Sequence, residues 1–155
     1  MIFWLASYPK SGNTLLRSLL ASYFYSKDGF FNFELLKKIP YFPSHNFYKN
    51  LNLDIKDDHE VIKNYINAQK KFIQNKKRIF FLKTHSSLLR ANNHSFTNLQ
   101  TSLGAIYVVR DPRKVVVSYA NHFQMNIDQA TEALMKDMGV YERNTRMKTF
   151  CGKWN

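Results

Sequence analysis

The sequence of 155 residues predicts an α/β fold, a three-layer sandwich in which helices cover both faces of a parallel sheet. Two observations predict it. Short apolar runs alternate with segments of helical periodicity, and strands joined through helices pair in parallel with right-handed crossovers. Polar clusters also follow directly after the apolar runs, as loops at the carboxyl edge of such a sheet do. Three strands are few for this architecture, and the sequence stops abruptly after TFCGKWN, so we expect a fold truncated at its C-terminus.

The first expected strand is Ile2–Ser7, a continuous apolar run typical of a strand buried on both faces. Residues 14–25 then predict a helix. Its apolar residues fall on one side: Leu15, Leu16, Leu19, Leu20 and Tyr23. Residues 27–53 are irregular and aromatic, interrupted by Pro40 and Pro43. The aromatic side chains from 30 to 48 line an acceptor pocket or simply belong to the core, and the sequence favours neither.

The second half of the sequence predicts three more helices and two more strands. Asp57 and Asp58 are expected to cap a helix that extends to about residue 75. Strands are expected at 78–85 and 104–112, the second stopped by Asp-Pro. Pro112 suits the first turn of a helix, and residues 126–138 predict a further one that Gly139 stops.

The composition favours an anionic partner. Lys and Arg number 23 against 11 Asp and Glu, a net charge of +12. A nucleotide, a nucleic acid, a membrane surface or a sulfated or phosphorylated small molecule all fit this charge.

Cys151 is the one cysteine, which excludes an intrachain disulfide and fits a reducing compartment. The apolar N-terminal run is too short for a signal or membrane segment, so we expect a cytoplasmic protein without a membrane partner.

Three polar clusters each follow an expected strand. They are residues 10–14 (KSGNT), 83–85 (KTH) and 110–112 (RDP). The carboxyl ends of parallel strands meet at one edge of the sheet, where ligands bind, so we expect the three clusters to form one site.

The first cluster has the features of an anion-binding site. A strand, a tight loop and a helix expose backbone N–H groups at the helix start, where the helix dipole favours negative charge. Gly12 allows close approach of the backbone, and Lys10, Ser11 and Thr14 add a charge and hydroxyl donors. The loop lacks the Gly-Lys-Ser/Thr ending of nucleoside triphosphatases, which argues against a nucleotide kinase. The alternative is an ordinary turn in which Thr14 caps the helix.

Together the motifs resemble those of the cytosolic-type sulfotransferases, in particular their bacterial members. YPKSGNT at 8–14 is similar to that family's 5′-phosphosulfate loop, KTH at 83–85 to its Lys-Thr-His segment, and VVRDPRKVVVSYANHF at 108–123 to its 3′-phosphate signature. The three occur in the family's order, and the resemblance extends from Ile2 to about Trp154. It implies the P-loop nucleotide-kinase-like sulfotransferase fold, with residues 1–155 as a single, partial domain.

The resemblance also implies a reaction. A sulfuryl group would pass from 3′-phosphoadenosine 5′-phosphosulfate (PAPS) to a hydroxyl or amine of a small-molecule or carbohydrate acceptor, leaving 3′-phosphoadenosine 5′-phosphate (PAP), without a metal. His85 would be the general base, and Lys10 and Lys83 would stabilise the transferring and leaving groups. The donor-binding residues would be Lys10, Ser11, Gly12, Asn13, Thr14, Leu15, Arg110 and Ser118. Such a transfer depends on alignment and on positive charge where negative charge develops.

Two departures from the family pattern leave alternative functions open for this chain. Leu15 replaces the usual Trp that stacks on adenine, and GKWN lies near the middle of the family's domain, before further helices and a loop that closes on the 3′-phosphate. The chain is therefore also read as an inactive nucleotide-binding fragment or as half of a split enzyme, completed by an oligomer or a downstream segment. A basic nucleic-acid-binding module fits less well, because the polar clusters lie at strand ends and not along one face with interleaved aromatics.

Overall fold

The computed structural model describes residues 1–49, 51, 53–88, 90–136, 138–141 and 148–151. Their elements follow one another as β1 (Ile2–Ser7), α1 (Asn13–Tyr25), the 3₁₀ helix η1 (Phe33–Lys38), α2 (His45–Tyr48), α3 (Asp58–Lys63), α4 (Tyr65–Ile73), β2 (Phe80–Thr84), β3 (Arg90–Ala91), β4 (His94–Ser95), β5 (Ser102–Val108), α5 (Pro112–Phe123), α6 (Ile127–Met135), β6 (Met138–Tyr141) and β7 (Lys148–Cys151). No helix among these residues is long and apolar enough to cross a membrane.

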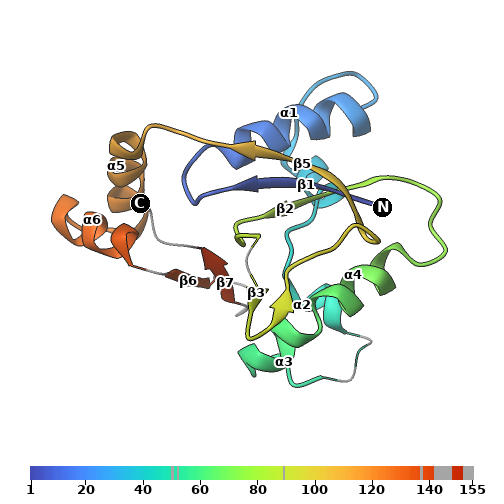
Figure 1. Cartoon of the computed structure of the whole chain (residues 1–155). Coiled ribbons are helices and arrows are strands. Elements are labelled where there is room, and N and C mark those ends of the chain that lie inside the picture. The colour runs from blue at the N-terminus through green and yellow to red at the C-terminus, as the bar shows by residue number, and fades with distance from the viewer. Residues whose placement is uncertain (50, 52, 89, 137, 142–147, 152–155) are drawn as a thin grey trace.

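The central sheet is parallel, in the order β2-β1-β5, which confirms the predicted fold class (Figure 1). Leu5 of β1 lies beside Lys83 on one side and Ile106 on the other. The free edge of β2 carries a short extra segment, because Lys83 N–H donates to the Pro40 carbonyl at 2.9 Å and Phe42 N–H donates to the Lys83 carbonyl at 2.8 Å. All three predicted strands are present, with ends shifted by a few residues.

β1 is buried on both faces, as its continuous apolar run predicts. On one face Ile2 and Trp4 pack with Leu82 against helices α2 to α4, and Phe42 lies at the centre of a group of rings from these elements. On the other face Leu5 packs against Ala21 of α1 and the residues around η1. Figure 1 shows α1 on one side of the sheet and α2 to α4 on the other, which are the outer layers of the sandwich.

Helices α5 and α6 form a smaller core of their own beyond the end of β5. Val115, Tyr119 and Ala120 of α5 pack against Ala130 and Leu134 of α6. Pro112 opens α5 as predicted, with the Asp111 side chain accepting from the Arg113 N–H. A capping box between Asn126 and Gln129 starts α6.

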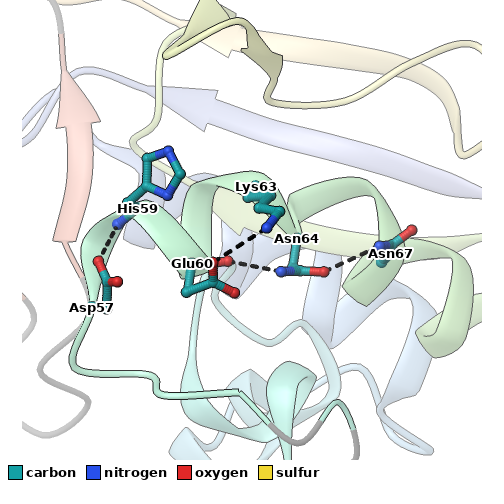
Figure 2. Close-up of polar contacts among 6 residues, drawn as sticks. All are labelled: Asp57, His59, Glu60, Lys63, Asn64 and Asn67. Atoms are coloured by element: carbon teal, nitrogen blue, oxygen red, sulfur yellow. Dashed lines mark hydrogen bonds and ion pairs between the residues drawn. The ribbon is translucent and has the colours of Figure 1, made fainter.

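The helix expected up to residue 75 is interrupted at Asn64. The chain forms α3 up to Lys63 and α4 from Tyr65, and the Asn64 side-chain amide donates to the Glu60 carbonyl at 3.0 Å (Figure 2). An Asn side chain that bonds the backbone one turn earlier competes with the regular helix ladder. Asn64 therefore redirects the chain, and the prediction of one continuous helix is wrong.

The predicted end of the last helix is also wrong. α6 ends at Met135, and Gly139 lies inside β6, which pairs antiparallel with β7. The helical pattern of 126–138 is local, whereas β6 depends on a partner strand about ten residues further along the chain. Periodicity alone does not reveal such a pair.

α1 buries only part of the side that the leucine pattern suggests, because Leu16 and Leu20 pack against the core around Leu5 whereas the other members are exposed. Leu15, Leu19 and Tyr23 are 67%, 61% and 80% exposed. The buried side is shifted toward Asn13, Arg17 and Ala21. The Asn13 amide donates to the Leu5 carbonyl, and Arg17 donates to the carbonyls of Leu36 and Ile39 at 2.6 Å each. These polar contacts fix the rotation of the helix about its axis.

β5 is only partly covered by the described residues. It pairs with β1 along one edge, and Leu103, Tyr107 and Val109 are 52%, 64% and 73% exposed. Strands of parallel sheets are normally covered on both faces. The described residues therefore leave part of β5 uncovered. Trp154, where the family resemblance ends, lies outside the described residues.

Candidate functional site

The carboxyl ends of the three parallel strands lie at one edge of the sheet. Ala6 of β1 is level with Thr84 of β2, and Ser7 is level with Val108 of β5. In Figure 1 the loops that leave these strands gather on the side of the sheet toward α5. The three sequence clusters start at these ends, so the fold brings them together as expected.

The loop after β1 turns sharply through two residues with positive φ. Lys10 has a φ of 65° and Gly12 a φ of 104°. A Cβ added at Gly12 would meet nothing within 4 Å, so the backbone borders open space there. Gly12 is the N-cap of α1 and supplies no side-chain cap, so the alternative of Thr14 as helix cap is wrong. The first N–H groups of α1 remain available to an anion.

Ser11 and Asn13 have buried side chains with different surroundings. The Ser11 hydroxyl is buried and has no hydrogen-bond partner among the described residues, as a donor reserved for a ligand would be. The Asn13 amide donates to the Leu5 carbonyl at 2.8 Å, inside the fold. Asn13 thus anchors the loop with its side chain, and its backbone N–H belongs to the first turn of α1.

Arg110 connects the third cluster to the first. Its guanidinium donates to the carbonyl of Lys10 at 3.1 Å, across 100 residues of sequence. The ion pair at the start of α5 is between Arg113 and Asp111, at 2.9 Å, and not between Arg110 and Asp111. Arg110 is exposed, so its remaining N–H donors lie next to the loop after β1.

The remaining predicted donor contacts lie on helices beside this loop. Thr14 and Leu15 are exposed on the first turn of α1, and Leu15 offers an apolar surface where the family has Trp. Ser118 is half-buried on α5, about two turns from its start.

His85 is held in one tautomer by the end of β1. Its Nδ1 lies 2.8 Å from the Ser7 carbonyl oxygen and 3.2 Å from the Ser7 hydroxyl. A carbonyl only accepts, so Nδ1 carries the proton and Nε2 keeps its lone pair. Ser7 was missed by the sequence analysis, because a main-chain acceptor leaves no signal in the residue type.

The pKa of His85 is lowered from 6.5 to about 4, first by burial and then by the positive charges of Lys83 and Lys10. The imidazole is therefore neutral at pH 7 and able to accept a proton. Lys83 lies on the same strand end, with its ammonium 5.1 Å from the centre of the Tyr41 ring. Lys10 and Lys83, the two lysines expected to be catalytic, thus both act electrostatically on His85.

Tyr41 and Cys151 complete the surroundings of His85. The Tyr41 ring lies 6.0 Å from the imidazole, and the Cys151 thiol donates to the His85 carbonyl at 2.9 Å. Burial raises the pKa of Cys151 to about 12, so it stays a thiol. The sequence around Cys151 gives no sign of this contact, since β7 reaches the end of β2 only through the tertiary fold. Among the described residues no group of three or more His, Cys, Asp and Glu side chains is placed to hold a metal.

Comparison with known proteins identifies the family of the chain. A family profile described as "Sulfotransferase domain" matches residues 2–155. Among solved structures, a crystal structure of retinol dehydratase in complex with androsterone and inactive cofactor PAP is 20% identical, with a TM-score of 0.49. The match covers 87% of this chain and 45% of that chain. No curated protein matches. The profile match extends over almost the whole sequence and includes all three clusters, and the chain therefore belongs to the sulfotransferase domain family.

Proposed function

We propose that this chain binds PAPS and carries the catalytic residues of a sulfotransferase, as part of a single domain that includes residues 1–155. The observation that supports this most directly is the contact between Arg110 and the Lys10 carbonyl, which joins the expected 3′-phosphate and 5′-phosphosulfate clusters. The exposed helix start at Gly12 and the unpartnered Ser11 hydroxyl fit a bound phosphate.

Each residue of the site has a separate role in donor binding or in sulfuryl transfer. Backbone N–H groups of 11–14, the Ser11 hydroxyl and Lys10 hold the 5′-phosphate, and Arg110 with Ser118 holds the 3′-phosphate. Leu15 contacts the adenine. PAPS supplies the sulfuryl group, and Lys10 and Lys83 place positive charge where negative charge grows during transfer. His85 Nε2 accepts the proton of the acceptor hydroxyl or amine, because Nδ1 is committed to the Ser7 carbonyl.

Calorimetry with PAP and with AMP tests the donor site. Wild type should bind PAP roughly tenfold or more tightly, the difference expected of one or two charge-assisted hydrogen bonds to the 3′-phosphate. Arg110→Gln should remove most of this preference. Arg113→Gln is the matched control, since it removes the same charge from an arginine paired with Asp111. Equal affinity of wild type for the two nucleotides would refute the assignment of Arg110 and Ser118.

A nucleotide-binding fragment without catalytic activity is the second candidate. The exposed side chains of β5 favour it, because uncovered strand surface indicates that further structure completes the fold. This candidate predicts the same preference for PAP but no transfer of sulfate by residues 1–155 alone.

A further inference from the structure

A second basic surface lies away from the candidate site. The stretch from Val61 to Arg110, both included, holds no Asp or Glu, whereas it holds nine Lys and Arg residues. Five of these cations, which we call the α4 basic surface, lie at the end of α4 and in the connection to β2: Lys70, Lys71, Lys76, Lys77 and Arg78. All five are exposed.

Aromatic rings hold two of these cations in place. The Lys76 ammonium lies 4.4 Å from the centre of the Phe72 ring and donates to the Phe72 carbonyl at 2.6 Å. The Arg78 guanidinium lies 4.5 Å from the centre of the Phe80 ring. Elsewhere, Lys63 and Lys136 pair with a glutamate on their own helix. A ring contact positions a cation without cancelling its charge, so the α4 basic surface is both ordered and strongly positive.

A hollow of about 540 Å³ opens beside these cations. Its lining combines two lysines, two amides and two aliphatic side chains: Lys70, Lys71, Asn67, Gln74, Leu51 and Ile73. Asn64 accepts from the Asn67 amide at 3.1 Å and so orients it at the start of α4 (Figure 2). The hollow thus places charge, hydrogen-bonding groups and apolar surface next to one another.

We propose that the α4 basic surface and this hollow bind an acidic polysaccharide, a chain of sugar units carrying carboxylate or sulfate groups. The lysines pair with the anionic groups, Asn67 and Gln74 bond hydroxyls, and Leu51 and Ile73 contact the apolar faces of sugar rings. A lipid bilayer fits less well, because Leu51 and Ile73 are half-buried in a concave surface. Single-stranded nucleic acid needs exposed aromatic faces, whereas Phe72 is half-buried, Phe80 is buried, and cations lie over both rings.

This surface is distinct from the donor site. In Figure 1 the connection from α4 to β2 lies on the side of the sheet where the strands begin, opposite the loops that follow the strand ends. The inference therefore does not rest on the proposed function, and saturating PAP should leave polysaccharide binding unchanged.

Calorimetry of the full chain with a heparin hexasaccharide provides the test. Lys70→Gln/Lys71→Gln should weaken binding roughly tenfold, as expected for two lost charge-assisted contacts. The matched control is Lys37→Gln/Lys38→Gln, which removes two exposed lysines of η1 and gives the same net charge. The control should bind within about twofold of wild type. Equal weakening of both variants would overturn the proposal, because net charge alone would then explain binding.

A single substitution inside the hollow tests the site independently. Gln74→Glu places a negative charge among its lining residues and should weaken binding more than Gln100→Glu, an exposed change elsewhere. Thermal unfolding of each variant checks that it is folded. Tighter binding of wild type to a single-stranded oligonucleotide or to phosphatidylserine vesicles than to the hexasaccharide, or displacement of the hexasaccharide by PAP, would overturn the assignment.

Discussion

At the scale of single residues, His85 shows how neighbours set the chemistry of a side chain. The Ser7 carbonyl fixes its tautomer, and burial together with two lysines keeps it neutral. The residue type alone suggests a group that titrates close to neutral pH. Its surroundings convert it into a base that stays unprotonated well into the acidic range.

NMR titration should show this shift directly. We expect His85 in the folded chain to take up a proton with a midpoint near pH 4, in place of the ordinary 6.5. The lowered pKa stabilises the fold fully above about pH 6.5, and this contribution is lost as the pH falls toward 4, because the unfolded chain binds the proton first. A midpoint near 6.5 would contradict the burial and charge environment described here.

His85→Ala should separate catalysis from donor binding. In any form of the protein that transfers sulfate, we expect kcat to fall by on the order of a hundredfold or more, as loss of a general base does. The affinity for PAP should change little, since the residues proposed to bind the donor lie on α1, α5 and the loops before them. Turnover at saturating acceptor and calorimetry with PAP measure the two effects. An unchanged kcat would leave His85 with a structural role only.

At the scale of elements, the register between β1 and β5 depends on Gly104. A Cβ at this position would lie 3.1 Å from the ring of Phe3, closer than ordinary contact. The missing side chain lets the Phe3 ring lie against β5. The neighbouring Ala105 has the opposite environment, since it is exposed on the other face of the strand.

Gly104→Val and Ala105→Val therefore form a matched pair. Gly104→Val should lower the free energy of unfolding by roughly 1–3 kcal/mol, because the added side chain overpacks against Phe3. Ala105→Val should be close to neutral, since Val suits a strand and meets open space there. Denaturant unfolding measures both, and equal losses would show that the Phe3 contact does not limit this position.

At the scale of the whole molecule, coverage of the sheet is uneven. β1 lies between two layers, and β2 has neighbours on both edges, whereas β5 exposes Leu103 and Tyr107, and Val109 directly after it is exposed as well. The strand carries no charged residue or proline, the features that usually protect an edge. Residues 1–155 by themselves should consequently be marginally stable.

Self-association through β5 is the expected result. Light scattering coupled to size-exclusion chromatography should show species larger than a monomer that increase with concentration. Tyr107→Lys/Val109→Lys should reduce them by placing charge on the strand, whereas Phe33→Lys, on the 78% exposed Phe33 of η1, should not. A stable wild-type monomer would show that the surface of β5 needs no cover.

The sequence by itself determined the parallel sheet, its three strands and the placing of the three polar clusters at one edge of the sheet. These depend on local patterns: apolar runs reveal buried strands, and polar residues directly after them fall at a shared edge. The candidate residues of the three polar clusters could also be predicted from the sequence, because Lys10, His85 and Arg110 are recognised by residue type and spacing.

Only the tertiary structure decided how those residues are held. The Ser7 carbonyl and the Cys151 thiol reach His85 across 78 and 66 residues, and Arg110 reaches the Lys10 carbonyl across 100. The buried side of α1 and the pairing of β6 with β7 also depend on partners distant along the chain. Local periodicity reports the preference of a segment, whereas hydrogen bonds and packing between remote segments select among the arrangements that this preference allows.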